Sequence, residues 1–330
     1  MKAYQSLPLG QRKIYSELCE RIDRLETEIA FENQTFADVS AAFQAVYEDR
    51  PDFFWLNGSC KATTKTLGSR STVYFRPQLT EPLSAASISL QRQRLSQAID
   101  SLVRQAVRSN GNLYEQIVYL HDYMVQHTEY RESVHCHDAY GCLVEGRAVC
   151  AGYAAAFQLL MQKLAVECGR VHGGSATKRH LDDSHEWNYI RLSDGYYFVD
   201  VTWDDPVVNG SSAGDRLSHA FFCVDLQELR LTHRIAADQR LPQVWGRQFQ
   251  YYRYRGRYLD TYSFAAAQRV IQPQLRTGHG FSVKFGSAAQ TQAAVRDLID
   301  GQKVYTIPGM SDRISYNVSD SGLILEVTLR

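Results

Sequence analysis

A cysteine at the start of a predicted helix is the residue of this chain with the clearest chemical potential. Cys150 lies in Gly146–Tyr153 (GRAVCAGY), and the apolar residues that follow recur at helical spacing, which predicts a helix that begins at the cysteine. Unpaired backbone N–H groups and the positive end of the helix dipole would stabilise a thiolate there. Gly152 would let another backbone or a substrate approach closely. Because buried helical cysteines are common, Cys150 also needs a nearby base.

A candidate base and a candidate acid follow on a predicted β-hairpin. Residues 185–192 (HEWNYIRL) and 196–203 (YYFVDVTW) have the pattern of strands, and the turn signal 193–195 (SDG) stands between them. His185 opens the first strand. Asp200 lies in the second between two valines, an apolar setting in which a carboxylate needs a cation or a donor. A nucleophile needs a base and the base an orienting group, so these two residues and the cysteine are our predicted catalytic triad.

The register of this hairpin leaves the identity of the acid open. A two-residue turn at Asp194-Gly195 gives His185 and Asp200 the parity of residues on one face. The same turn sets His185 opposite Asp204, however, with Asp200 four residues away, roughly 13 Å at about 3.3 Å per residue. We therefore expect a β-bulge or a longer loop that brings Asp200 to His185. The alternative is that Asp204 is the orienting acid.

Three sequence blocks also resemble a known family. Gly146–Tyr153, His185–Asn188 (HEWN) and Val199–Pro206 (VDVTWDDP) are similar, in order and spacing, to the motifs of the bacterial transglutaminase-like superfamily. The resemblance covers about residues 110–235. The family pattern often has Ala where this chain has Glu186, but a neighbouring strand residue points to the other face and should leave the site intact.

The resemblance implies a papain-like α+β fold and acyl transfer through a thioester. It implies Cys150 as nucleophile, His185 as general base and then acid, and Asp200 as orienting acid. Members of the family act as amide hydrolases, as cross-linkers that use lysine amines, or as deglycosylating enzymes.

The groups that would bind an oxyanion are less well marked. The backbone N–H of Cys150 can supply one donor. Enzymes of this kind take the second from an upstream Gln or Trp, and neither stands close before the cysteine. Tyr140 offers a hydroxyl, and Trp187, Trp203 and Asp204 are our further candidates for oxyanion or substrate contacts.

Other clusters of reactive side chains predict no cofactor or metal. His135-Cys136-His137 and Cys142 offer zinc ligands, but their spacing does not match a zinc finger or ribbon. A Gly-His-Gly run at 278–280 lacks the third glycine of a dinucleotide-binding loop. His219 and His233 follow the motif region and are candidates for the rim of a cleft, but we expect both to lie at the surface.

Composition indicates which classes of partner and which cellular location to expect. The 36 basic and 36 acidic residues cancel, so no global field draws the chain to nucleic acid or to an anionic membrane. Seven scattered cysteines do not form a disulfide framework. No stretch approaches the roughly 18 apolar residues of a membrane span, and residues 1–10 lack a signal-peptide core. We expect a cytoplasmic protein, with export by another route left open, and a protein or peptide substrate.

The elements that must position these residues divide the chain into three regions. We predict a mainly helical N-terminal region (1–110), a catalytic domain (111–245) and a small α+β C-terminal domain (246–330) that serves packing or partner binding. Periodicity predicts two helices within 10–48, helices at 85–108, 113–127, 264–275 and 288–299, and strands at 71–75, 251–258, 281–285, 314–318 and 323–329. Residues 251–258 (YYRYRGRY) read as a strand with a solvated face in preference to a site for single-stranded nucleic acid.

The sequence thus predicts an α+β enzyme with a papain-like core. Its reaction would be thiol-dependent acyl transfer or hydrolysis of peptide or side-chain amides, with water preferred as the acceptor. Three alternatives stay open: a cross-linking transglutaminase with an amine acceptor, a glycan-releasing amidase, and a catalytically silent binding scaffold.

Overall fold

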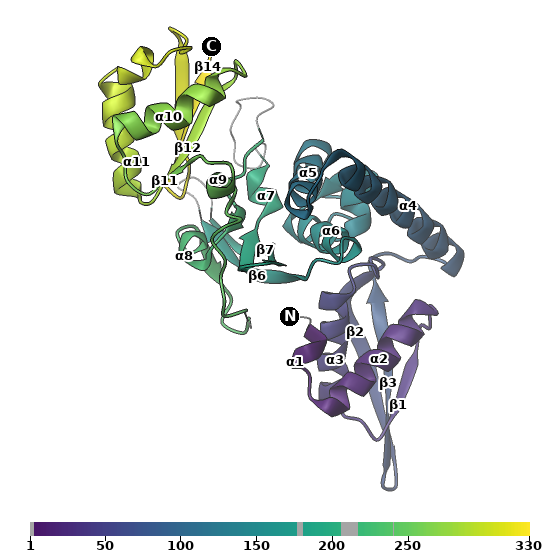
Figure 1. The fold of residues 1–330 in the computed structure, drawn as a ribbon. Coiled ribbons are helices and arrows are strands. Elements are labelled where there is room, and N and C mark those ends of the chain that lie inside the picture. The colour runs from purple at the N-terminus through teal and green to yellow at the C-terminus, as the bar shows by residue number, and fades with distance from the viewer. Residues whose placement is uncertain (1–2, 177–180, 206–216, 240) are drawn as a thin grey trace.

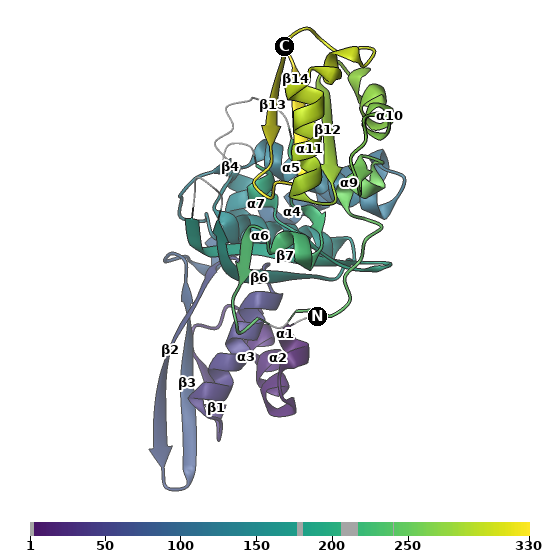
Figure 2. The ribbon, with the colours of Figure 1, turned by 90° about the vertical axis from the view of Figure 1, so that its left-hand side faces the viewer.

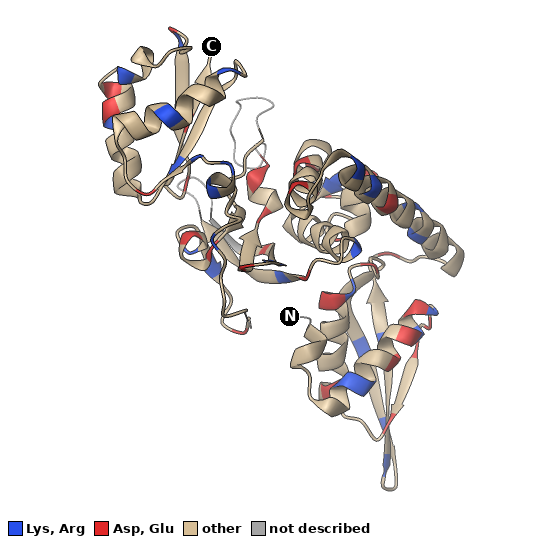
Figure 3. Ribbon diagram, in the orientation of Figure 1, with Lys and Arg blue, Asp and Glu red and all other residues tan. Residues whose placement is uncertain are grey.

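The computed structural model describes residues 3–176, 181–205, 217–239 and 241–330, which form three units in chain order (Figure 1). Each unit combines helices with strands, so the α+β prediction is confirmed. Charges of both signs are spread over all three units (Figure 3). Within the described residues, no helix has the length and apolar character that crossing a membrane requires.

The N-terminal unit packs three helices on a three-stranded sheet. Its helices are α1 (Ala3–Ser6), α2 (Leu9–Asp23) and α3 (Phe36–Asp49), and its strands are β1 (Ile29–Glu32), β2 (Leu56–Leu67) and β3 (Arg70–Leu79) in the order β1-β3-β2. The hairpin of β2 and β3 extends well beyond the helices (Figure 2). The sequence did not predict β1 or β2. Most of β2 is exposed on both faces, so it lacks the apolar alternation by which strands are recognised.

Three helices of the central unit pack against one another. They are α4 (Ala85–Ser109), α5 (Leu113–His127) and α6 (Cys150–Lys163). Because α4 packs against both α5 and α6, it belongs physically to the central unit, although we predicted a domain boundary at residue 110. The short strands β4 (Glu129–Tyr130) and β5 (Arg147–Ala148) pair in parallel, and a π-helical turn, η1 (Gly141–Glu145), precedes β5.

An antiparallel five-stranded sheet completes the central unit. Its order is β10-β6-β7-β8-β9, with β6 (Cys168–Ala176), β7 (Leu181–Leu192), β8 (Gly195–Val199), β9 (Phe222–Val224) and β10 (His233–Ile235). Helix α6 packs against β6 and β7. The predicted second strand of the hairpin was wrong in its last part, because the chain leaves the sheet after Val199 and turns into the short helix α7 (Val201–Asp204).

The C-terminal unit has its own hydrophobic core. Its sheet has the order β11-β12-β14-β13, with β11 (Tyr258–Leu259), β12 (Gly280–Phe285), β13 (Ile314–Val318) and β14 (Ile324–Leu329). Its helical segments are α10 (Phe264–Leu275), α11 (Ala288–Ala294), the π-helical η2 (Val295–Asp300) and the 3₁₀ turn η3 (Lys303–Thr306). The strand predicted at 251–258 was wrong: residues Tyr251–Tyr254 form the helix α9, whose first two tyrosines are buried.

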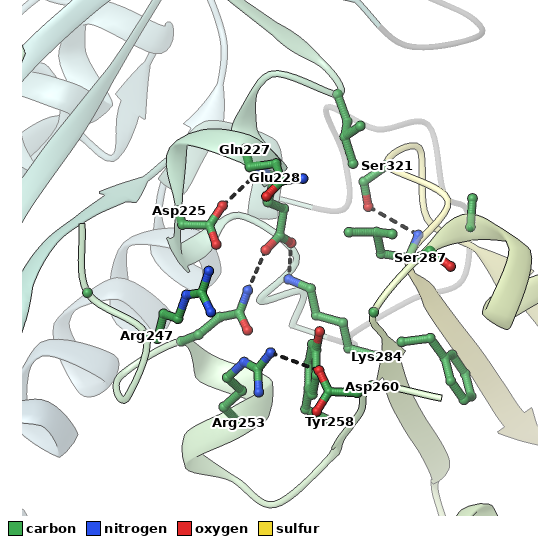
Figure 4. A pocket seen from close by; sticks show the side chains of 17 residues that line it. Asp225, Gln227, Glu228, Arg247, Arg253, Tyr258, Asp260, Lys284, Ser287 and Ser321 are labelled. Carbon is green, nitrogen blue, oxygen red and sulfur yellow. Dashed lines mark hydrogen bonds and ion pairs between the residues drawn. The ribbon is translucent and has the colours of Figure 1, made fainter. Parts of the chain in front are cut away.

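A buried ion pair joins the central and C-terminal units. Lys284 of β12 contacts Glu228 of helix α8 (Leu226–Leu229), and both side chains are almost fully enclosed. A cavity of about 410 Å³ lies beside this pair (Figure 4). Arg247 and Arg253 also line it, so the junction of the two units is rich in charge.

Candidate active site

Helix α6 begins at Cys150, as its sequence predicted. The preceding chain is fixed by the pairing of β5 with β4 and by a hydrogen bond from the Val149 N–H to the carbonyl of Cys136. That carbonyl also crosses the first turn of the helix, because a Cβ atom at Gly152 would lie only 2.3 Å from it. Gly152 is thus required by close approach of the backbone, which is one of its two predicted uses.

Cys150 differs from most of the other cysteines in its exposure. All seven are free thiols, and four of them, Cys136, Cys142, Cys168 and Cys223, are buried. Cys150 is partly exposed, together with Cys19 and Cys60. The absence of a disulfide framework among the cysteines agrees with the sequence prediction.

His185 and Asp200 form a short, buried hydrogen bond. The distance from His185 Nε2 to Asp200 Oδ2 is 2.6 Å, and the residues are 3% and 1% exposed. The thiol of Cys150 lies close enough to His185 to raise the pKa of its imidazole. Since Asp200 occupies Nε2, Nδ1 is the ring atom left for the thiol. The start of α6, the strand β7 and the end of β8 therefore bring the three predicted residues together in the order thiol, imidazole, carboxylate.

The observed register and the turn into α7 together explain why Asp200 and not Asp204 reaches His185. Both aspartates stand two residues from the position that faces His185, but Asp204 lies in α7 and binds His121 instead. Leu192 pairs with Gly195, so the turn is centred one residue earlier than predicted, and the ladder runs regularly to the end of β8. Continued in this register, His185 would face position 202, which leaves Asp200 two residues away, about 7 Å along the strand. An imidazole bridges such a diagonal. The expected bulge or longer loop between these strands was therefore wrong.

The electrostatics of the pair favour a charged imidazole. Burial lowers the pKa of His185, but the charge and hydrogen bond of Asp200, aided by the nearby thiol of Cys150, outweigh it and raise the pKa to about 10. Burial opposes ionisation of Asp200 as well, yet contacts with His185 and His233 hold the pKa of Asp200 well below its usual range. At neutral pH the pair is an imidazolium and a carboxylate.

His233 is a second histidine on the same carboxylate, and the sequence reading missed it. Its Nε2 lies 3.0 Å from Asp200 Oδ2, and the residue is 4% exposed, so the predicted surface position was wrong. His233 opens β10, which pairs with the edge of β6. No local sequence signal marks it, because the contact joins residues 33 positions apart on non-adjacent strands.

The two predicted tryptophans enclose the histidines. The Trp187 ring stacks on His185 with a centroid distance of 5.6 Å, and Trp203 lies 5.9 Å from His185 and 4.8 Å from His233. Both tryptophans are buried. The indole Nε1 of Trp187 has no hydrogen-bond partner within the described part of the chain, but it is enclosed. In this structure both tryptophans pack around the buried His–Asp pair. Their predicted position at an open substrate or oxyanion site is corrected accordingly.

The three aspartates of the block 199–206 bind three different elements. Asp200 holds β7 through His185, and its other oxygen accepts the N–H of Trp203 as the cap of α7. Asp204 is fully buried and binds His121 of α5. Asp205 accepts a hydrogen bond from Tyr153 of α6. Asp204 thus anchors α7, and its alternative role as the orienting acid was wrong.

A buried chain of side chains continues from Asp204. His121 contacts Asp204 through Nε2 (3.2 Å) and Asp122 through Nδ1 (2.9 Å), and His219 contacts the same oxygen of Asp122 (2.8 Å). Burial lowers the pKa of His121, but the hydrogen bonds to both carboxylates raise it to about 9. The ring of His219 stacks on Tyr251 and is buried, so its predicted surface position was wrong.

Tyr140 occupies a core position. It is 4% exposed, its ring stacks on Phe54 at 5.1 Å, and it meets His135 edge-on. It therefore packs where the N-terminal unit meets the central unit. The geometry does not single Tyr140 out as an oxyanion donor.

The four ligands considered for zinc do not converge on one point. His135 binds Asp138 (2.7 Å) and Glu81 (3.2 Å), whereas Cys142 contacts Thr128. Three other groups have ligand atoms within 4.8 Å of one another: His121, Asp122 and His219; Glu132, Cys136 and His137; and His185, Asp200 and His233. In the first and third groups the nitrogen–oxygen contacts of 2.6–3.0 Å are hydrogen-bond lengths. Ligands of a tetrahedral zinc ion would stand roughly 3.3 Å apart.

Two cavities of the described structure lie apart from Cys150, the predicted nucleophile. The cavity of Figure 4 is lined by residues of α8, α9 and the C-terminal unit, and Cys150, His185 and Asp200 are not among them. A second cavity of about 210 Å³ lies between residues 174–176 and 230–234 and includes His233.

Comparison with known proteins finds a family match for part of the chain. Residues 100–201 match the family described as the Transglutaminase-like superfamily. No curated protein matches the chain. Among solved structures, "Crystal structure of a TGase" is similar over 48% of this chain and 46% of its own, at 10% identity and a TM-score of 0.31. This chain therefore spans about half the length of that protein.

Two further structures have comparable similarity. A "Putative Cysteine Protease from Cytophaga hutchinsonii" matches at 16% identity over 54% of this chain and 67% of its own, with a TM-score of 0.27. A "putative protease from Parabacteroides distasonis ATCC 8503" matches at 11% identity over 42% of this chain and 35% of its own, with a TM-score of 0.25. The family match covers the start of α6, β7 and the end of β8, so this part of the chain is similar to a transglutaminase-like domain.

Proposed function

We propose that the protein is a thiol-dependent enzyme that hydrolyses or transfers the acyl group of peptide or side-chain amides. Cys150 is the nucleophile, His185 the base and then the acid, and Asp200 the orienting acid. The observation that carries the proposal is the buried 2.6 Å His185–Asp200 hydrogen bond beside a partly exposed thiol at a helix start. The family match over residues 100–201 supports the same class of reaction.

The first half of the reaction forms a thioester. The proton of the pair lies on Nδ1 of the His185 imidazolium, so Cys150 reacts as the thiolate. Its sulfur electron pair attacks the amide carbonyl carbon to form a C–S bond and an oxyanion. Backbone N–H groups in the first turn of α6 are suited to receive that oxyanion. When the oxyanion collapses, the C–N bond breaks and the leaving amine takes the proton from His185.

The second half returns the enzyme to its starting state. Water attacks the thioester carbon and gives a proton to His185. The C–S bond then breaks, the sulfur of Cys150 is again a thiolate beside the protonated His185, and the product leaves as a carboxylic acid. If a primary amine replaces water, the same steps yield a new amide. No oxidant, reductant or metal ion enters the balance.

The state of His185 suits the acid step. With its pKa raised to about 10, His185 holds its proton at neutral pH and has it ready for the leaving amine. Asp200 stays ionised and stabilises that charge in a dry setting, where the interaction is stronger than in water.

The acceptor is tested with a glutamine-containing protein and a labelled primary amine. Wild-type protein is incubated with casein and dansylcadaverine, and released ammonia, glutamate formation and bound label are measured together. We expect ammonia and glutamate without bound label, because water is our proposed acceptor. Bound label without glutamate formation would instead assign an amine acceptor.

A cysteine variant separates the enzyme from a silent scaffold. Cys150→Ala should fold with an unchanged melting temperature and lose all turnover, whereas Cys60→Ala, which removes another partly exposed thiol outside the site, should retain it. If casein is inert, cleavage of a mixed peptide library is followed by mass spectrometry with the same variants. Equal product yields from wild type and Cys150→Ala in both assays would support the scaffold.

A further inference from the structure

Asp200 accepts three hydrogen bonds, and two of them arrive at one oxygen. His185 Nε2 lies 2.6 Å and His233 Nε2 lies 3.0 Å from Oδ2, while the backbone N–H of Trp203 donates to Oδ1 at 3.1 Å. The backbone contact and His233 together fix the plane of the carboxylate. His185 and His233 also compete for the charge of the same oxygen.

The hydrogen bonds of His233 define its protonation. Asp200 can only accept at Oδ2, so Nε2 of His233 carries a proton. On its other side Nδ1 lies 2.9 Å from the hydroxyl of Thr232, whose oxygen is also 3.4 Å from the carbonyl oxygen of Leu229. Burial lowers the pKa of His233 although Asp200 opposes this effect, and the charge of His185 lowers it further. His233 is therefore the neutral tautomer with the proton on Nε2, and His185 is the charged partner.

The surroundings hold the His233 ring still. Its neighbours are aromatic: the ring centroids of Trp187, Trp203 and Phe221 lie 4.9, 4.8 and 5.3 Å from it. Its backbone is paired with Ser175 across β6 and β10. A ring held by these neighbours loses little entropy when its Nε2–H donates a hydrogen bond. It can therefore act as a fixed dipole.

We propose that His233 is a positioning residue: its neutral Nε2–H locks the Asp200 carboxylate and limits how strongly that carboxylate holds the proton-bearing imidazole of His185. The inference rests on the proposed function and concerns the same site. His233 acts through Asp200 and touches neither the thiol nor the reacting atoms.

The proposal has a definite sign. A neutral donor withdraws part of the charge of Asp200, so its removal leaves the carboxylate a stronger partner for the imidazolium and moves the loss of the His185 proton to higher pH. The titratable groups facing this pair within the described residues are Cys150 from α6, His185 from β7 and His233 from β10. Proton delivery to the leaving amine then slows, because His185 is less acidic and the Asp200 carboxylate is no longer held in place by His233.

The test uses one variant that removes the donor and one that restores it. His233→Leu keeps a similar volume without a donor, and His233→Gln places an amide N–H near the former Nε2. We expect His233→Leu to lower kcat by roughly ten-fold to a hundred-fold, the range for losing a hydrogen bond to a charged group, with KM unchanged. The alkaline limb of the pH profile of kcat in His233→Leu should move up by about one pH unit. His233→Gln should recover most of both effects.

An NMR titration supplies a readout that needs no substrate. Imidazole ¹⁵N signals of the full chain should show His233 as the neutral Nε2–H tautomer and His185 titrating at higher pH in His233→Leu than in wild type. A doubly protonated His233 at neutral pH, an unmoved His185 titration, or His233→Gln as impaired as His233→Leu would overturn the proposal.

Two controls separate possible failures. If His233→Leu does not fold, as judged by its thermal transition, Thr232→Val removes the hydroxyl beside Nδ1 and should give a smaller change of the same sign, and no change would overturn the proposal. An active wild type whose His233 variants behave like it refutes the role of His233 alone. Cys150→Ala with full turnover refutes the proposed function itself.

Discussion

Replacing Asp200 by asparagine separates the charge of the third residue from its shape. The amide oxygen can still accept from His185 Nε2, but the negative charge is gone. The rise in the pKa of His185 from 6.5 to about 10, at about 1.4 kcal/mol per pH unit, corresponds to roughly 5 kcal/mol of preference for the imidazolium. Asp200 is the first of the groups that raise it. We therefore expect Asp200→Asn to move the alkaline limb of kcat/KM down by about two pH units or more.

The same substitution has a signed effect on stability. Since the folded pKa of His185 lies above its unfolded value of 6.5, the stability it contributes is fully present below pH 6.5 and is lost as the pH rises through about 10. Asp200, whose folded pKa is depressed, contributes above its unfolded value of 3.8. The loss of unfolding free energy in Asp200→Asn should thus be largest between about pH 4 and 6.5 and shrink toward pH 10.

The assay is urea denaturation at several pH values together with the pH profile of turnover. Asp205→Asn is the matched control, because this neighbouring buried aspartate binds Tyr153 and not a histidine of the site. Its loss of stability should not follow the His185 titration. An alkaline limb that stays near pH 10 in Asp200→Asn, or a stability difference that grows with pH, would refute the reasoning.

Three other substitutions test the supporting structure. Lys284→Met should destabilise the chain by about 3–5 kcal/mol in urea, because it leaves the buried Glu228 carboxylate without its cation, and adding Glu228→Leu should recover most of that loss. Gly152→Ala should lower the free energy of unfolding by about 1–3 kcal/mol, since its Cβ would collide with a backbone carbonyl. Gly10→Ala, in a helix with open space around it, should be neutral or stabilising. Equal effects of the two substitutions would contradict the packing at α6. His121→Leu should lower stability most below pH 6.5, with a loss that fades as the pH approaches about 9; a constant difference would contradict the raised pKa.

The sequence predicted the parts of the site that depend on local pattern. The helix that begins at Cys150 follows from the spacing of the apolar residues after it, and the hairpin of β7 and β8 from alternation and a turn signal. The family resemblance was confirmed by a match that covers the same segments. These features are encoded within short stretches of chain.

The parts that the sequence did not predict depend on register and on distant contacts. The segment after Val199 has the pattern of a strand, yet the side chain of Asp200 accepts the N–H of Trp203 and starts a helix instead. A turn displaced by one residue brings Asp200 within reach of His185, and the entry into α7 directs Asp204 to His121. His233 reaches the site only because β10 is placed beside β6, which no local pattern specifies.

The reactivity of Cys150 tests the central claim most directly. The protein is treated at pH 7 with a limiting amount of iodoacetamide, and alkylation of each cysteine is timed by mass spectrometry in wild type and in His185→Ala. Cys19 and Cys60 are internal controls, because they are partly exposed as Cys150 is and burial raises the pKa of both thiols. The account predicts that Cys150 reacts at least about ten-fold faster than either, and that His185→Ala removes the difference. Equal rates for the three thiols in wild type, or a fast Cys150 that does not need His185, would contradict it.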